Sequence, residues 1–385
     1  MTVLNVAMFG SDELAKEVAK ATDQRDVHTY VHKELTDGEA KIISIIRPAK
    51  FPERLRPLLN AISAGRVGLI EVNEINATIG EVIVAFASSS IKRGIAVIRP
   101  LDGGWVDQEM VEKMFMQAGL NGWQFMQPDG LDIRNQLYAL MDEINDELIQ
   151  SAQSPLVVSI DQYFNVKGIG LVAIGYVQCG TLKVHDELHI LPAKGNGSTK
   201  SLQVMDDDVP EARSGDRVGI ALRNAKEESL SNGSIIVKPA LLDKKTSTDI
   251  PLSVIEHKSS MLKLSTSPFQ KRQLAQGDVI HVSLDLQFIV GRIKSVEKDN
   301  VVVLVPHVGP FTIIALLSLA ASISVSPEPS FIGQYATSPL ELVLIFCSAE
   351  ISEAENARSH IETWSIDPWS VSYTHLRAHE TLRYL

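Results

Sequence analysis

Hydrophobic runs alternate with helical patterns over the first 150 residues, and this alternation limits the fold more than any other feature. Strand–helix alternation is typical of a parallel sheet covered by helices on both faces. Buried parallel strands take the form of continuous apolar runs, as found here. The expected strands are Leu4–Phe9, Lys41–Ile46, Val67–Val72 and Ile95–Ile98, and the expected helices are Asp12–Ala21, Phe51–Ala64, Ile79–Ser89, Asp107–Gly119 and Gly130–Ile149.

The pattern changes after the polar linker Gln150–Pro155. Short β-rich runs then follow one another about ten residues apart, separated by Gly, Asp and Asn turns, which indicates a β-barrel. A second β-rich block starts at Leu252. We therefore expect an α/β domain at 1–150, a barrel at 154–245 and an incomplete barrel at 250–340, with 341–370 unassigned; a chain of 385 residues is long enough for this.

The ends of the chain and one apolar run need separate treatment. Val301–Val325 carries no charge, but His307 and Pro310 interrupt it and no basic cluster flanks it, so we expect core rather than a membrane helix. The start of the chain has no cationic segment, and no signal peptide is expected. Val371–Leu385 resembles translated adapter sequence, so we leave it out of the fold and expect the natural C-terminus to be missing.

Composition excludes several functions. The net charge of −11 disfavours non-specific binding to nucleic acid, and no DNA partner is expected. Cys179 and Cys347 lie far apart without ligand spacing, which argues against a zinc site or a disulfide framework and agrees with a cytoplasmic location. We expect no membrane association, and the sequence does not indicate an oligomeric state.

The first barrel carries the most specific pattern. Residues 160–180 are IDQYFNVKGIGLVAIGYVQCG, followed by VHDEL at 184–188 and SGDRVGIAL at 214–222. This order resembles domain 2 of the translational GTPases, a family that includes elongation factor Tu, its archaeal and eukaryotic counterparts and the selenocysteine-specific elongation factor. SPFQKR at 267–272, with Gly277 and Asp278, is similar to the third domain of the same factors.

The residues of this pattern have physical roles of their own. We expect a bulge or sharp bend at Gly168 and Gly170, because glycine tolerates unusual backbone angles. Close approaches or turns are expected at the two later glycines, and turns with side-chain bonds to local backbone N–H groups at two aspartates. These four residues are Gly175, Gly180, Asp186 and Asp216.

The resemblance implies that the first domain is a GTPase domain with a phosphate-binding loop, GxxxxGK[ST]. Gly10 and Lys16 keep the spacing, but Ala15 replaces the second glycine and Glu17 replaces the hydroxyl residue. Acids at positions 12, 13 and 17 would repel a triphosphate. The alternative is an ordinary helix start whose acids complement the helix dipole.

The other nucleotide motifs are also degraded. The DxPGH position, residues 46–50, has the sequence IRPAK, and the NKxD position, residues 99–102, has RPLD, which keeps only Asp102. The segment between the first helix and the second strand is short for the effector loop of the family. We therefore expect no catalytic residues and no cofactor, with Gly10, Lys16 and Asp102 as remnants of a nucleotide site; GTP and Mg²⁺ would bind only in an atypical GTPase.

No metal site is expected. His28 and His32 lack the HExxH context of a zinc site and are expected in a surface loop. His185 and His189 are expected at exposed positions around a barrel turn. The acidic run at 206–208 lacks the alternating ligands of a calcium loop and is expected to be a solvated turn.

The resemblance implies a translation-associated protein that binds tRNA, another RNA or the ribosome without a GTP cycle. Lys167, Arg217 and Arg272 are the basic residues of the matched motifs and our candidates for RNA binding, with solvated barrel charges as the alternative. Two other functions stay open: an atypical GTP-binding elongation factor with GTPase activity, and a protein-interaction scaffold with no role in RNA binding.

Overall fold

A computed structural model gives the fold, and it describes most of the first 239 residues and parts of the remainder. The described residues are 1–24, 27–36, 38–89, 91–101, 104–191, 193, 195–239, 252–257, 261–265, 273–284, 286–297, 300–304, 311–316 and 342–344.

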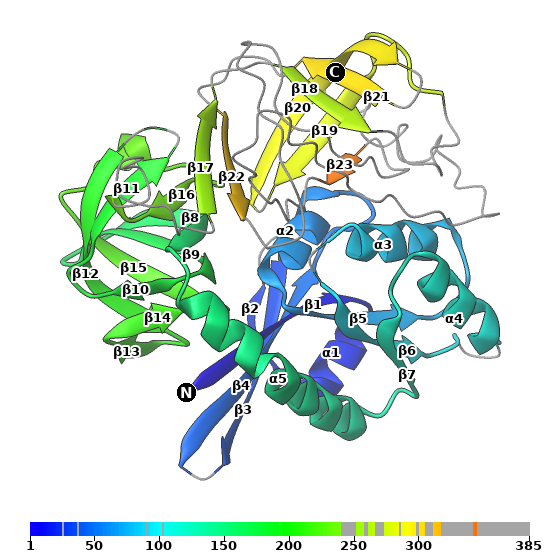
Figure 1. Cartoon of the computed structure of the whole chain (residues 1–385). Coiled ribbons are helices and arrows are strands. Elements are labelled where there is room, and N and C mark those ends of the chain that lie inside the picture. The colour runs from blue at the N-terminus through cyan, green and yellow to red at the C-terminus, as the bar shows by residue number, and fades with distance from the viewer. Residues whose placement is uncertain are drawn as a thin grey trace.

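The first domain contains a seven-stranded sheet in the order β2-β3-β4-β1-β5-β6-β7 (Figure 1). Its strands are β1 (Thr2–Phe9), β2 (Lys20–Gln24), β3 (Val27–Thr36), β4 (Glu39–Pro48), β5 (Val67–Val72), β6 (Arg93–Ile98) and β7 (Gly122–Met126). The strands from β4 to β7 in this order are parallel. The loops that follow them therefore meet at one edge of the sheet.

Helices cover both faces of this sheet and bury two apolar clusters against it. On one face lie α1 (Asp12–Val18) and α5 (Gly130–Ala152). On the other lie α2 (Arg56–Ala64), α3 (Ala77–Ala87) and α4 (Gln108–Gln117). The predicted α/β architecture is confirmed.

Several details of the prediction for this domain were wrong. The sheet is not wholly parallel, because β3 runs antiparallel to β4 and to β2. The first helix ends at Val18 rather than Ala21, and the short segment after it forms β2 and β3 instead of a loop. The second helix begins at Arg56 rather than Phe51, and β7 was not predicted, because its sequence GWQFM has no run of β-branched residues.

The second domain is the predicted barrel. Its main strands are β8 (Val157–Val166), β9 (Gly170–Cys179), β11 (Glu187–Leu191), β12 (Gly195–Val204), β15 (Arg217–Arg223) and β16 (Ile235–Val237). They form a sheet in the order β11-β16-β8-β9-β15-β12, with β13 (Asp207–Val209) beyond β12. Because β11 also pairs with β12, the sheet closes on itself. β10 (Thr181–Lys183) and β14 (Glu211–Arg213) form a separate ribbon.

The turn chemistry of the barrel agrees with the prediction. Asp186 Oδ2 accepts a hydrogen bond from Lys183 N, and Asp216 Oδ2 accepts one from Arg213 N, both at 2.7 Å. A Cβ on Gly175 would lie 2.3 Å from the backbone oxygen of Ser159, which confirms the close approach.

The two glycines for which a bulge or sharp bend was expected lie elsewhere. Gly168 and Gly170 have φ of 85° and 102°, but they form the turn from β8 to β9 rather than a bend within a strand. Left-handed angles favour glycine there. Gly180, with φ of 79°, lies at the predicted turn after β9.

The third block is also β-rich. It contains β17 (Leu252–His257) paired with β22 (Phe311–Leu316), and a sheet of β18 (Met261–Ser265), β19 (Val279–Leu284), β20 (Gln287–Glu297), β21 (Asn300–Leu304) and β23 (Leu342–Leu344). The described parts of the apolar run Val301–Val325 are thus strands, as expected. Among the described residues, no helix has the length and hydrophobicity needed to cross a membrane.

Direct hydrogen bonds join the α/β domain to the barrel. The Asn5 side chain donates to Gly215 O at 2.6 Å from within β1. Arg66 Nη2 donates to the backbone oxygens of Val177 and Gln178, both at 3.0 Å. These contacts fix the carbonyl groups of one domain to side chains of the other, so the two domains share a polar interface as well as apolar packing.

Candidate functional site

The loop between β1 and α1 consists of Gly10 and Ser11 alone. Ser11 Oγ accepts a hydrogen bond from Leu14 N at 3.1 Å and so caps the helix. A phosphate-binding loop is longer, since its backbone N–H groups must surround the phosphate oxygens. Two residues are too few for that arrangement.

Glu71 of β5 occupies the space beside this loop. Its side chain is 1% exposed, and its carboxylate accepts hydrogen bonds from Ser11 N and, at 3.1 Å, from Ser11 Oγ. A Cβ on residue 10 would lie 2.8 Å from Glu71 Cβ, so Gly10 permits the close approach of Glu71. The anion that meets the start of α1 is a carboxylate of the protein itself.

Residues at the predicted motif positions contact one another and Glu71. Arg99, at the NKxD position, lies 3.6 Å from Glu71 Oε1 and 3.0 Å from Glu17 Oε1. Arg47, at the DxPGH position, donates through Nε to Gly10 O at 2.6 Å. These side chains therefore contact other residues of the same chain.

Lys16 lies in the last turn of α1 and forms an ion pair with Asp12, one turn earlier on the same helix. Tyr30 donates its hydroxyl hydrogen to Asp12. The hydrogen bonds from Lys16 and Tyr30 lower the pKa of the Asp12 carboxyl. Burial, together with Asp12, raises the pKa of Tyr30 to about 12. Lys16, the second predicted remnant, is therefore engaged with an acid of its own helix.

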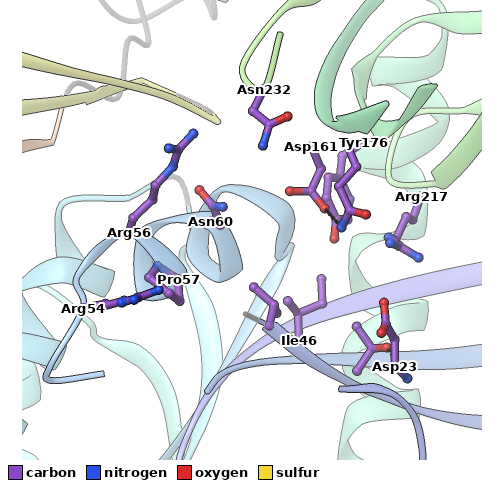
Figure 2. A pocket seen from close by; sticks show the side chains of 13 residues that line it. Asp23, Ile46, Arg54, Arg56, Pro57, Asn60, Asp161, Tyr176, Arg217 and Asn232 are labelled. Atoms are coloured by element: carbon purple, nitrogen blue, oxygen red, sulfur yellow. Dashed lines mark hydrogen bonds between the residues drawn. The ribbon is translucent and has the colours of Figure 1, made fainter. Parts of the chain in front are cut away.

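A pocket lies between the α/β domain and the barrel (Figure 2). The pocket has a volume of about 440 Å³. Strands β2, β3 and β4, the segment before α2 and α2 itself line one side, and β8, β9, β15 and the turn before β16 line the other. The charged and amide residues of the lining are Asp23, Arg54, Arg56, Asn60, Asp161, Gln162, Arg217 and Asn232.

Arg217 is the predicted site residue that reaches this pocket. Its Nε is buried and has no hydrogen-bond acceptor among the described residues. Tyr176, which pairs with Arg217 across β9 and β15, is 6% exposed, and burial raises its pKa to about 12. The tyrosine therefore stays neutral and offers a hydroxyl group beside a guanidinium group.

The other predicted basic residues do not join Arg217. Lys167 is exposed in the β8–β9 turn and does not line the pocket. It lies close in sequence to two exposed apolar side chains, Phe164 (40% exposed) and Ile169 (47%). Arg272 and Asp102 lie outside the described residues.

The histidines for which a metal site was considered lie in a strand or at a barrel turn. His28 and His32 are on β3 and not in a loop, and His32 Nδ1 lies 2.8 Å from the Tyr138 hydroxyl oxygen. His185, at φ 73°, is exposed at a barrel turn. In the parts of the chain that the structure describes, no group of three His, Cys, Asp or Glu side chains has the arrangement of a metal site.

Sequence reasoning missed Glu71, Arg47 and the pocket. A glutamate in the otherwise apolar run VGLIEV was the available signal for Glu71, because a charge in a buried strand needs a partner. No signal identified Arg54 and Arg56 as pocket residues, since the pocket forms only when α2 meets the barrel.

Comparison with known proteins agrees with this architecture. The family model of elongation factor Tu domain 2 matches residues 170–237. The chain is 31% identical over 171 residues to the selenocysteine-specific elongation factor of Methanocaldococcus jannaschii. The second domain of this chain is therefore similar to domain 2 of the translational elongation factors.

The match to the selenocysteine-specific factor covers less than half of either protein. The match covers 44% of this chain and 34% of the selenocysteine-specific factor. An uncharacterised protein of the same archaeon is 26% identical over 302 residues, covering 78% of this chain and 89% of that protein. In fold, the chain is similar to translation elongation factor SelB from Methanococcus maripaludis, solved with a GTP analogue, with a TM-score of 0.57, 19% identity and coverage of 82% and 73%.

Proposed function

We propose that this elongation factor relative binds RNA in translation, with tRNA as the first candidate, and does so without a GTP hydrolysis cycle. The observation that supports the absence of a GTP hydrolysis cycle is Glu71, whose buried carboxylate bonds to Ser11 at the start of α1. A triphosphate there would have to displace this carboxylate and would meet Asp12 and Glu17 close by. Like charges at such short range in a partly dry site repel strongly.

The RNA half of the proposal is supported by the barrel. It is the part of the chain that matches domain 2 of the elongation factors. Lys167 in its β8–β9 turn lies between Phe164 of β8 and Ile169 in the sequence, and all three side chains are exposed. A cation beside apolar and aromatic surface suits a phosphate and a stacked base. The proposed role places the protein in the cytoplasm with the ribosome and predicts no DNA partner.

Nucleotide binding tests the loss of the GTP cycle. Fluorescently labelled GTP and GDP with Mg²⁺ are titrated into the full chain. We expect no binding at micromolar concentrations and no release of phosphate from GTP. Binding at micromolar concentrations that depends on Mg²⁺ would instead favour an atypical GTPase.

RNA binding is tested with aminoacyl-tRNA at several salt concentrations. Binding through phosphates weakens steeply with salt, and the Lys167→Gln variant should reduce the slope of log K against log salt by about one. Lys113→Gln, an exposed lysine of α4, is the matched control and should leave the slope unchanged. Absence of salt-dependent binding would favour the protein scaffold over the RNA-binding role.

A further inference from the structure

Trp105 lies in the segment that joins β6 to α4, and its side chain is 80% exposed. The other tryptophan that the structure describes, Trp123, is 5% exposed and packs against Phe86 and Phe115. An exposed indole keeps a large apolar surface in water, which favours its burial against a partner.

Trp105 is not an isolated exposed residue. Leu101 and Met110 of the same segment are 58% and 38% exposed. The next loop adds Leu131 at the start of α5, which is 60% exposed. Because β6 and β7 are parallel neighbours, the loops that follow them leave the sheet at the same edge. Single exposed apolar side chains are common, whereas several within one short segment are typical of an interaction surface.

The backbone is fixed on both sides of Trp105. Gly104 N donates to the backbone oxygen of residue 101 at 2.7 Å, which closes a turn before the tryptophan. Val106, directly after it, is buried in the apolar cluster beneath α4. Asp107 then caps the first turn of α4 with a side-chain hydrogen bond of 3.1 Å. A partner would therefore not have to order this backbone on binding, which lowers the entropic cost of the contact.

The charges next to these side chains in the sequence are all negative. Residues 104–112 and 127–132 contain no Lys or Arg and five acids, which are Asp107, Glu109, Glu112, Asp129 and Asp132. An anionic surface repels the phosphates of RNA and of anionic lipids. A second copy of the chain, with its net charge of −11, would place the same acids against each other in a two-fold interface. A basic protein partner meets none of these penalties.

We propose that the α/β domain binds a partner protein here, with Trp105 at the centre of the contact. The partner supplies an amphipathic helix with apolar side chains on one face and Lys or Arg beside them. Buried aromatic anchors contribute most of the affinity of such contacts, and complementary charges select the partner. The inference goes beyond the RNA-binding function, because it concerns the α/β domain and requires neither RNA nor the Lys167 turn.

A fluorescently labelled amphipathic peptide of leucine and lysine, LKKLLKLLKKLLKL, tests the proposal by fluorescence anisotropy with the full chain. The same peptide with glutamate in place of every lysine is the charge control, and we expect it to bind at least about tenfold more weakly. Trp105→Ser should weaken binding of the lysine peptide by about tenfold or more, as is typical of a central tryptophan. Leu101→Ser should weaken it less.

Leu35→Ser is the matched control for these variants. Leu35 is 73% exposed on β3 and pairs with Ala40 near the start of β4, whereas the proposed site follows the end of β6. Its substitution should leave the affinity unchanged. Glu109→Lys combined with Asp132→Lys should reverse the preference between the two peptides. Urea unfolding checks that each variant is folded.

Several outcomes would overturn the proposal. These are no binding of the lysine peptide, equal binding of both peptides, and binding that Trp105→Ser and Leu101→Ser both retain. A dimer of the wild-type chain in sedimentation that Trp105→Ser dissociates would assign the surface to a second copy instead. Loss of tRNA binding in Trp105→Ser would assign it to RNA. Lys167→Gln should keep full peptide binding, which separates this contact from the RNA-binding function.

Discussion

The edge of the sheet around Gly10 and the turns of the barrel both carry family motifs, but they differ in what those motifs contact. In the barrel, Asp186 and Asp216 bond to backbone groups three residues away, and Gly175 makes room for a neighbouring strand. At the sheet edge, the corresponding motif positions serve a bound nucleotide in the family. A motif that serves the protein's own backbone is required whether or not a ligand binds.

The polar side chains at the sheet edge bond to one another. Glu71 bonds to Ser11, Arg99 approaches Glu71 and Glu17, and Arg47 bonds to Gly10. Buried polar groups must find partners, so side chains that lose a ligand have to satisfy one another. Contacts between the protein's own side chains therefore hold this edge of the sheet together.

A substitution of Glu71 is the most direct test of the contacts at the sheet edge. Glu71→Ala removes a buried acceptor, leaves Ser11 N without its bond and creates a cavity, so we expect a loss of roughly 2–4 kcal/mol in the free energy of unfolding. Urea unfolding measures the change. Glu71→Gln keeps the size and one acceptor oxygen and should lose less than half as much. Equal stability of Glu71→Ala and the wild-type chain would show that the carboxylate has no structural role.

A second buried acid in the α/β domain gives an effect that depends on pH. Glu81 on α3 is 4% exposed, and burial raises its pKa to about 7 from an ordinary value of 4.5. A raised pKa means that the folded state favours the protonated form, so this stabilisation is present in full below pH 4.5 and is lost as the pH rises through 7. Glu81→Gln imitates the protonated form at every pH.

We therefore expect Glu81→Gln to match the wild-type chain closely at pH 4.5 and to exceed it at pH 8 by roughly 3 kcal/mol, given about 1.4 kcal/mol for each unit of pKa shift. Urea unfolding at pH values between 4.5 and 8 measures the difference. A difference that stays constant with pH would contradict the role of the Glu81 charge. The exposed Glu109 of α4 provides the control, since Glu109→Gln should change stability little at either pH.

The same contrast explains what the sequence could and could not predict. Local signals, such as the apolar runs of the sheet and the Gly and Asp turns of the barrel, predicted the architecture and the Asp186 and Asp216 bonds. The segment after α1 was predicted incorrectly, because β3 is held by pairing with β4, and β2 by pairing with β3, and not by a pattern of their own. The Glu71 contact joins residues 60 positions apart, and the pocket joins two domains, so neither has a local signal.

The barrel offers a matched pair of glycines that sharpens the comparison. Gly175 and Gly219 lie on the neighbouring strands β9 and β15. An alanine Cβ at 175 would lie 2.3 Å from the backbone oxygen of Ser159, whereas at 219 its nearest neighbour is 3.8 Å away. Gly175→Ala should cost about 1–2 kcal/mol through overpacking against backbone, and Gly219→Ala should cost almost nothing. Urea unfolding of both variants checks this, and equal costs would remove the close approach as the reason for Gly175.

The smallest expected effect is at the barrel turn that contains Asp216. Variants there distinguish the contribution of its hydrogen bond from that of its charge. Burial raises the pKa of Asp216 to about 6, although Arg213 opposes this through its N–H bond and its charge. The stabilisation from protonated Asp216 is therefore lost as the pH rises through 6. Asp216→Asn keeps an acceptor for Arg213 N without the buried charge, so it should equal or exceed the wild-type stability at pH 8.

Asp216→Ala loses the acceptor and should cost about 1 kcal/mol, the typical value of one such hydrogen bond. Urea unfolding of the Asn and Ala variants at pH 5 and pH 8 distinguishes the two contributions. If Asn and Ala cost the same at both pH values, the hydrogen bond to Arg213 N does not hold the turn. If instead only Ala is destabilised, the aspartate of this motif is required for its bond to the backbone and not for its charge. That outcome would explain why the barrel needs this aspartate whether or not the chain binds a ligand.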